Sequence, residues 1–164
     1  EGWIERLKSG LTLNVSLAGR LQPGQATAQQ RIRQSWSQHP ARSRHPSPAG
    51  RAEPVLPEDV RALALMLPET VAGAHRGNPD FRVGGRVFAT LWVEEDRVVL
   101  RLAPADQAEL CEAEPDLFTP LDGAWGRRGW TNLDLDPCEE ETLRAALLAA
   151  WRFTAPAILR AAYA

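Results

Sequence analysis

The sequence lacks the features that define membrane-spanning proteins and disulfide-rich domains. Its uninterrupted apolar runs are a handful of residues long, far short of the about 20 that a membrane-spanning helix needs. The two cysteines, Cys111 and Cys138, are too few for a disulfide framework, and the 26 residues between them match no zinc-ligand spacing. His39 and His45 match no metal pattern either. We therefore expect a cytoplasmic domain with no membrane partner and no cofactor or metal.

Recognisable catalytic motifs are also missing. No Gly-rich phosphate loop follows an expected strand, and no carboxylate pair or Ser/His/Asp order stands out. His75 could serve as a general base, but it stands alone in a segment rich in glycine and proline. These absences favour a non-enzymatic binding domain. An uncharacterised enzyme that uses His75 or Cys138 remains an alternative.

The formal net charge of −2 hides two segments of opposite charge. Residues 1–52 contain eight basic and two acidic side chains, a net charge of +6, and are rich in Gln, Ser, Pro, Arg, Gly and Ala. Residues 53–164 contain eleven basic and nineteen acidic side chains, a net charge of −8. We expect residues 1–52 to be a disordered basic N-terminal extension, or a start artefact because the chain begins at Glu1, and residues 53–164 to fold.

Hydrophobic patterning predicts a helix followed by three antiparallel strands. From Pro57 to Leu67, apolar residues recur at the spacing of one helix face, and a loop is expected to follow. Two alternating runs, 81–83 and 86–93, then flank Gly84-Gly85, where both glycines can adopt the positive φ of a tight hairpin turn. A third strand is predicted at residues 97–102. The loop before the hairpin contains Gly73, Gly77 and Pro79.

The second half of the chain predicts a helix from Pro104, a loop-rich segment over 115–129 with a short strand near Leu117-Phe118, and a strand over 130–135. The resulting order is α-β-β-β-α-(β)-β-α. Consecutive antiparallel strands with helices gathered at the ends are typical of an α+β domain in which the helices cover one face of a small sheet. The order shows no crossover βαβ unit, which argues against a doubly wound nucleotide-binding fold.

The start of the closing helix has the most specific local signals. Asp136 suits the N-cap, Pro137 suits the first helical position, and Glu139 completes a capping box. Cys138 would then occupy the second helical position, where the helix dipole favours a thiolate and the neighbouring glutamates oppose it. Pro156 is expected to end this helix before a last short one.

The chain resembles the MmcQ/YjbR-like family over about residues 55–163. The resemblance rests on an ordered set of short motifs: Leu67-Pro68, Pro79-Asp80-Phe81-Arg82-Val83-Gly84-Gly85-Arg86-Val87-Phe88-Ala89, Leu100-Arg101-Leu102, Pro104, Glu109-Leu110, Gly129-Trp130, Leu133-Asp134-Leu135 and Ala155-Pro156. It implies a compact α+β domain similar to secretion-chaperone-like folds, of a bacterial type. Family members are described as predicted DNA-binding proteins with a double-wing arrangement, and no catalytic residue carries over from them.

Two departures from the family pattern bear on any shared site. Many members have lysine where this chain has Arg82, Arg86 and Arg101, which keeps the charge but changes the hydrogen-bonding fork. Some members have a His-rich segment where this chain reads Ala124-Trp125-Gly126-Arg127-Arg128-Gly129-Trp130. A role proposed for those histidines therefore does not transfer.

Arginine and tryptophan side chains gather in and beside the predicted strands. Alternation places Arg97, Val99 and Arg101 on one sheet face, which Phe88, Thr90 and Trp92 share if the strand register allows. Arginines interleaved with aromatic rings suit contact with phosphates and stacking on bases. The predicted residues for binding an anion or nucleic acid are Arg82, Arg86, Trp92, Arg101, Arg127, Arg128 and Trp130.

Two further interpretations of this face stay open. One face of an antiparallel sheet is normally solvated, and the exposed aromatic residues could instead contact a protein partner or a second copy in a homodimer. A folded domain with a net charge of −8 also repels duplex DNA at long range, so a local basic patch must overcome that repulsion.

Overall fold

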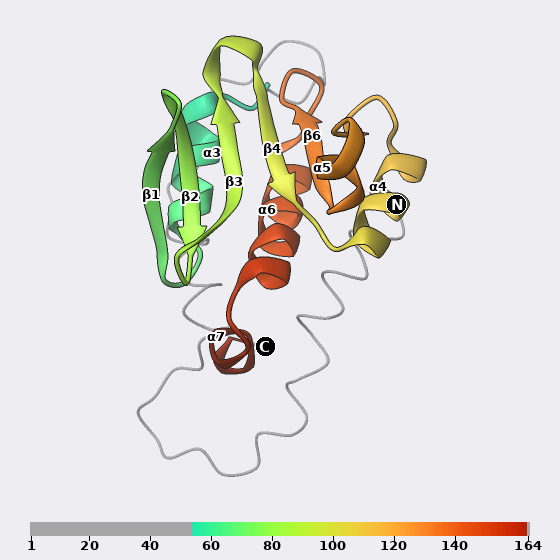
Figure 1. Cartoon of the computed structure of the whole chain (residues 1–164). Helices are drawn as coiled ribbons and strands as arrows, with labels where there is room; N and C mark the ends of the chain where they lie inside the picture. Colours follow the sequence, from blue (N-terminus) through green and yellow to red (C-terminus); the bar gives the residue numbers. More distant parts are fainter. Residues whose placement is uncertain (1–53, 164) are drawn as a thin grey trace.

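The computed structural model describes residues 54–163, so the extension expected for residues 1–52 lies outside the described residues. Its helices and strands are α3 (Pro57–Leu65), β1 (Thr70–His75), β2 (Asn78–Val83), β3 (Arg86–Trp92), β4 (Arg97–Arg101), α4 (Pro104–Ala113), β5 (Phe118–Pro120), α5 (Gly123–Arg127), β6 (Trp130–Asp134), α6 (Glu140–Thr154) and α7 (Ala157–Ala162) (Figure 1). A 3-10 turn at Val93–Glu95 joins β3 to β4. Neighbouring strands pair antiparallel in the order β1-β2-β3-β4-β6-β5. The α+β class is confirmed.

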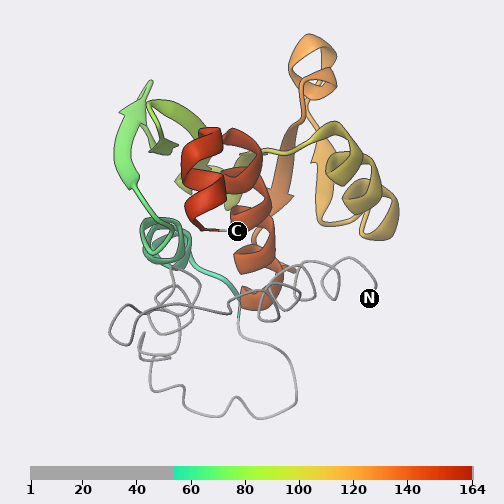
Figure 2. The ribbon, with the colours of Figure 1, turned by 90° about the horizontal axis from the view of Figure 1, so that it is seen from below.

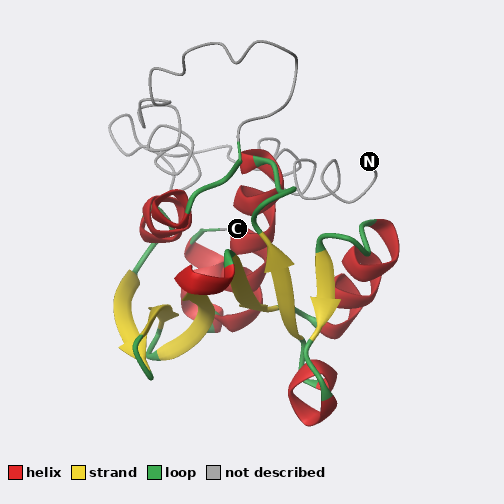
Figure 3. Cartoon of the chain, turned by 90° about the horizontal axis from the view of Figure 1, so that it is seen from above, coloured by secondary structure: helices red, strands yellow, loops and turns green. Residues whose placement is uncertain are grey.

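Two helices cover one face of this sheet. Figure 3 shows α3 and α6 on one side of the strands and the short helix α5 on the other, and Figure 2 shows the same layers from below. The core lies between α6 and the central strands, where Trp151 is almost completely buried. The Trp151 indole N–H donates a hydrogen bond of 2.9 Å to the carbonyl oxygen of Pro68, which ties α6 to the segment after α3.

The predicted β2–β3 hairpin turn is confirmed. Gly84 and Gly85 have φ angles of +55° and +75°, the region that a primed two-residue turn requires and that L-residues rarely adopt. Gly84 also lies against the Pro156 ring, because a Cβ built at Gly84 would come within 2.4 Å of the Pro156 Cγ. This contact packs the hairpin turn against the segment that joins α6 to α7.

A β-bulge in the same hairpin changes one expected position. Phe81 pairs with Ala89 and Arg82 pairs with Val87, so Phe88 is the extra residue on β3. Phe88 is fully buried in the core. The expectation that Phe88 shares the outer face with Thr90 is therefore wrong, because the bulge interrupts the alternation that the expectation assumed.

The element boundaries differ from the sequence expectation in two places. The segment expected to be a loop before the hairpin forms β1, an extra edge strand built largely of small residues. The closing helix α6 begins at Glu140 with Glu139 as its N-cap, so the predicted capping box at Asp136 is wrong. Cys138 therefore precedes the helix, and its backbone N–H donates to the Leu135 carbonyl oxygen in a turn.

Candidate anion-binding site

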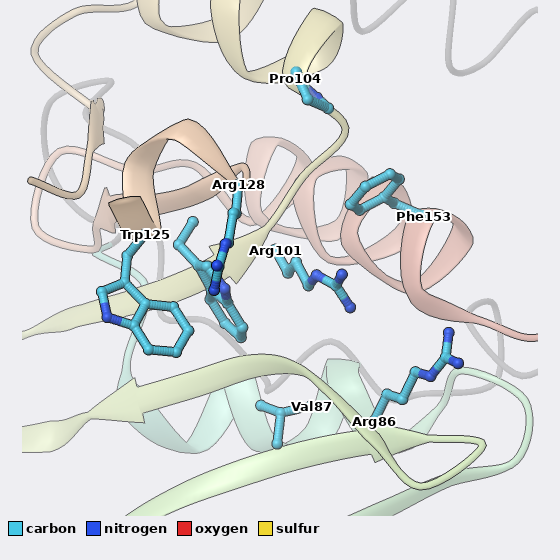
Figure 4. Close-up of a pocket in the computed structure, with 8 residues that line it drawn as sticks. Arg86, Val87, Arg101, Pro104, Trp125, Arg128 and Phe153 are labelled. Atoms are coloured by element: carbon cyan, nitrogen blue, oxygen red, sulfur yellow. The ribbon is translucent and has the colours of Figure 1, made fainter. Parts of the chain in front are cut away.

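A pocket of about 560 Å³ opens where β3 and β4 separate. The β3–β4 pairing ends at Ala89 and Leu100. The first residues of β3 continue along β2, whereas Arg101 at the end of β4 pairs with Trp130 of β6. The pocket forms between these diverging ends, and its wall consists of Arg86, Val87, Arg101, Pro104, Trp125, Arg128, Trp130 and Phe153 (Figure 4).

Three guanidinium groups give the pocket its charge. Arg86 and Arg128 are exposed and Arg101 is half-buried. Within residues 54–163, none of the three forms an ion pair, and no carboxylate lines the pocket. An anion that enters would therefore meet concentrated positive charge with no internal competitor for it. Guanidinium groups are suited to such a ligand because each presents several donors in a fork that matches phosphate or carboxylate oxygens.

Three aromatic rings, those of Trp125, Trp130 and Phe153, line the wall together with Val87 and Pro104. The rings of Trp125 and Trp130 meet edge to face, with centroids 6.0 Å apart and planes at 73°. The guanidinium of Arg128 lies 6.0 Å from the Trp125 ring, and that of Arg101 lies 5.3 Å from the Phe153 ring. Trp125 is 58% exposed, which leaves a large apolar surface available for a ligand.

Two of the arginines and Trp125 lie on opposite sides of the pocket. Figure 4 shows Arg86 and Arg101 extending toward the side where Phe153 lies, while Trp125 lies at the opposite side and Arg128 between them. A ligand with an anionic group at one end and a flat ring at the other fits this arrangement. Among the described residues, the wall presents guanidinium groups, aromatic rings and two aliphatic side chains.

Two glycines place α5 over the pocket. A Cβ built at Gly126 would lie 1.8 Å from the carbonyl oxygen of Leu121, and one built at Gly129 would lie 1.9 Å from that of Leu102. Gly129 also has a φ of +91°, and its carbonyl oxygen accepts a 2.9 Å hydrogen bond from the Leu102 N–H. These close backbone approaches fold the 121–130 segment back on the sheet and carry Trp125 and Arg128 to the pocket.

The pocket brings together four of the seven residues predicted from the sequence: Arg86, Arg101, Arg128 and Trp130. The other three lie outside its wall. Arg127 is exposed on α5. Trp92 lies beneath the Arg97 guanidinium at 4.6 Å, and Arg97 also donates hydrogen bonds to Glu95 and Asn132. Trp92 therefore belongs to a separate polar cluster at the other end of the sheet.

Arg82 is held by a buried carboxylate. Its Nε and Nη2 atoms donate hydrogen bonds of 2.8 Å to the two carboxylate oxygens of Asp80, a side chain with no exposed surface. On the neighbouring strand, a Cβ at Gly73 would come within 2.6 Å of this carboxylate, so only glycine leaves room for the pair. The arrangement gives Arg82 a structural role, and its predicted contact with a ligand stays a prediction.

We expect Arg82→Met to lower the free energy of unfolding at neutral pH, because the Asp80 carboxylate would stay buried without its counter-charge. Asp80→Asn in the same chain removes that charge, so the double variant should recover part of the loss. Urea unfolding of the wild type, both single variants and the double variant measures this coupling. A double variant as unstable as the sum of the single variants would contradict the assignment.

Sequence reasoning missed the aromatic residues Trp125 and Phe153, together with Val87 and Pro104. Trp125 was assigned to a loop, because a five-residue helix flanked by glycines has no periodicity to detect. Phe153 is 36% exposed near the end of α6. A large aromatic residue outside the apolar face of that helix was the available signal for a binding surface.

His75 and Cys138, either of which the enzymatic alternative would use, lie in different environments. His75 is exposed at the end of β1, whereas Cys138 is 2% exposed between β6 and α6. Burial, with smaller contributions from the charges of Glu114 and Glu139, raises the pKa of the Cys138 thiol to about 12. The described residues also contain no group of three or more His, Cys, Asp or Glu side chains arranged for a metal ion.

The raised pKa of Cys138 makes stability fall in alkaline solution. The unfolded thiol ionises near pH 9.0 and the folded thiol near pH 12, so the unfolded chain releases a proton that the folded chain keeps between these values. We expect the Cys138 contribution to be constant below pH 9 and to be lost above it, by up to about 1.4 kcal/mol per pH unit. Urea unfolding of wild type and Cys138→Ala over this range measures it, and equal slopes for the two proteins would contradict it.

The fold and the pocket define a small α+β domain with a basic, aromatic-lined pocket. The chain belongs to the YjbR family, whose family model, described as YjbR, matches residues 65–153. The resemblance predicted from the sequence is confirmed.

One solved structure is similar to the chain in fold. It is the crystal structure of the Deinococcus radiodurans protein DR2400, assigned to the family-model domain DUF419, with a TM-score of 0.53 and 22% identity, covering 60% of this chain and 77% of that one. None of the curated proteins matches the chain in sequence. Among the helices of the described residues, none is both long and apolar enough to span a membrane.

Proposed function

We propose that this YjbR domain is a non-enzymatic binding domain that holds a segment of single-stranded nucleic acid in the β3–β4 pocket. The observation that carries the proposal is the set of three guanidinium groups, Arg86, Arg101 and Arg128, which line one pocket without a carboxylate among its described wall residues. Trp125 and Trp130 lie beside them. Phosphate-binding arginines next to rings that can stack on bases are the elements by which proteins bind single strands.

The dimensions and charge of the domain favour a single strand over a duplex. A volume of about 560 Å³ lies within the range of small-ligand pockets, so it suits a nucleotide unit that enters the pocket. A duplex would keep its bases stacked inside the helix and would meet a domain whose net charge from residue 53 onward is −8. A nucleic-acid ligand also agrees with the cytoplasmic location expected from the sequence.

In the proposed complex, the side of the pocket with Arg86 and Arg101 and the side with Trp125 have different roles. The phosphate would lie at the side of Arg86 and Arg101, with Arg128 reaching it from α5, and the base would stack on the exposed face of Trp125. Each phosphate contact adds a salt-dependent share of the binding free energy, and each stacked base adds about 1–3 kcal/mol.

Binding of a labelled single-stranded oligonucleotide, followed by fluorescence anisotropy with the full chain, tests this assignment. We expect Arg128→Gln to weaken binding about tenfold and to reduce the slope of log K against log salt by about 1. Trp125→Ala should weaken binding about tenfold or more with little change in that slope. Arg127→Gln, a neighbouring exposed arginine outside the pocket wall, is the matched control and should change binding much less.

Two results would contradict the proposed function. One is equal loss in Arg127→Gln and Arg128→Gln, which would mean that general charge and not the pocket attracts the strand. The other is tighter binding of a duplex than of a single strand of the same length, which would mean that no unpaired base enters the pocket.

A further inference from the structure

The two edges of the sheet are protected to different extents. The β5 edge is only three residues long, ends in Pro120, which has no backbone N–H, and has α4 packed against it. The β1 edge is six residues long and reads Thr-Val-Ala-Gly-Ala-His, with no proline, lysine, arginine or carboxylate. Within residues 54–163 no strand pairs with its outer side, and β1 forms the free margin of the sheet in Figure 1. An open edge of this kind is a template for another strand.

The β1–β2 register identifies the backbone groups that β1 presents outward. Ala74 lies opposite Pro79, which has no N–H to donate, so this is a non-hydrogen-bonded pair of the ladder. Hydrogen-bonded and non-hydrogen-bonded pairs alternate, so the N–H and C=O groups of Ala72 and Ala74 point away from β2. The Thr70 carbonyl points the same way, whereas the Thr70 N–H donates to the Leu67 carbonyl oxygen.

We propose that this edge is a self-association surface, on which β1 of a second copy of this chain pairs antiparallel with β1 about a twofold axis at Ala72. The inference goes beyond the proposed function and does not depend on the pocket. In this register the Ala72 N–H of each copy donates to the Ala72 carbonyl of the other, and each Ala74 N–H donates to the opposite Thr70 carbonyl. Such a twofold pairing joins the two sheets into one.

The side chains along the edge fit a second copy in this register. Val71, which is 58% exposed, comes to lie beside Gly73 of the second copy and the Asp80–Arg82 pair that occupies the space over that glycine. Glu69 lies in the turn just before the strand, so in this register its carboxylate comes to the same end of the seam as the His75 imidazole of the second copy. The strand itself has no charged side chain that would face its own copy across the axis, apart from His75 at its end.

Sedimentation velocity of the full chain over a range of concentrations tests the proposal. We expect the weight-average sedimentation coefficient to rise with concentration from monomer toward dimer. In the same range, amide hydrogen exchange at Ala72 and Ala74 should slow, because these N–H groups gain partners only in the dimer.

Two substitutions locate the interface. Val71→Lys places an ammonium group from each copy at the seam and should shift the association to at least tenfold higher concentration. Val93→Lys is the matched control, since Val93 is 46% exposed in the turn between β3 and β4 and should leave the association unchanged. Ala72→Pro removes an outward N–H that has no partner among residues 54–163, so it should abolish the dimer while the thermal unfolding temperature shows that the fold is kept.

Three outcomes would overturn the proposal. A chain that stays monomeric at every concentration has no such interface. A dimer that Val71→Lys and Ala72→Pro leave intact forms through another surface. A monomeric chain whose Ala72 and Ala74 amides become protected only when an extended peptide is added uses this edge for a peptide partner.

Discussion

The variant Gly129→Ala is expected to lose about 4 kcal/mol or more of its free energy of unfolding. Two separate effects act at this position. The φ of +91° lies in a region that alanine rarely adopts, and the added methyl group would lie 1.9 Å from the Leu102 carbonyl oxygen. The oxygen belongs to the backbone between β4 and α4, so relief of the clash requires the two segments to move apart.

The control for this variant is Gly85→Ala. Gly85 also has a positive φ, +75°, but a Cβ built there has no atom within 4 Å. Gly85→Ala should therefore cost only the conformational penalty, about 1 kcal/mol. Urea unfolding of both variants gives the comparison, and a Gly129→Ala protein as stable as Gly85→Ala would show that the 121–130 segment does not depend on the close approach.

The second large effect is expected for Arg101→Glu, which should weaken the binding of a single-stranded oligonucleotide about 100-fold, or about 2–3 kcal/mol. Arg101 lies at the end of β4 where the pocket opens, half-buried and in contact with the Phe153 ring. A carboxylate there would repel the phosphate. It would also offer the Arg86 and Arg128 guanidinium groups an internal partner.

Arg61→Glu provides the matched control because it changes the net charge by the same amount. Arg61 is exposed on α3, a helix that contributes no residue to the pocket wall. Equal losses in Arg101→Glu and Arg61→Glu would assign the binding to overall charge. Arg101→Gln, which removes the charge without reversing it, should lie between the wild type and Arg101→Glu.

The parts of the fold that sequence predicts are those with local signals. The Gly84-Gly85 turn and the alternating strands beside it depend on backbone preferences of a few adjacent residues. Strand β1 has no such signal, because its small residues are explained by packing against the neighbouring strand and not by local backbone preference. Gly73 leaves room for the Asp80–Arg82 pair on the neighbouring strand. The start of α6 was misplaced because Asp136 and Pro137 favour a turn as well as a helix start.

The candidate site also has residues that the sequence predicts and residues that it does not. Charge and strand alternation point to Arg86, Arg101 and Trp130, which lie on or beside strands whose directions alternation predicts. Trp125 could not be placed from the sequence. Close backbone approaches to Leu121 and Leu102 position α5, and no local sequence pattern reveals these approaches. The bulge at Phe88 accompanies the separation of β3 from β4, and no periodicity in the sequence reveals it.

The most direct test of the pocket as the binding site is the NMR spectrum of the six tryptophan indole N–H groups during titration with a single-stranded oligonucleotide. The account predicts that the resonances of Trp125 and Trp130 shift together and saturate, while those of Trp92 and Trp151 stay in place. Shifts confined to Trp92, or to Trp3 and Trp36 in the basic N-terminal segment, would contradict it.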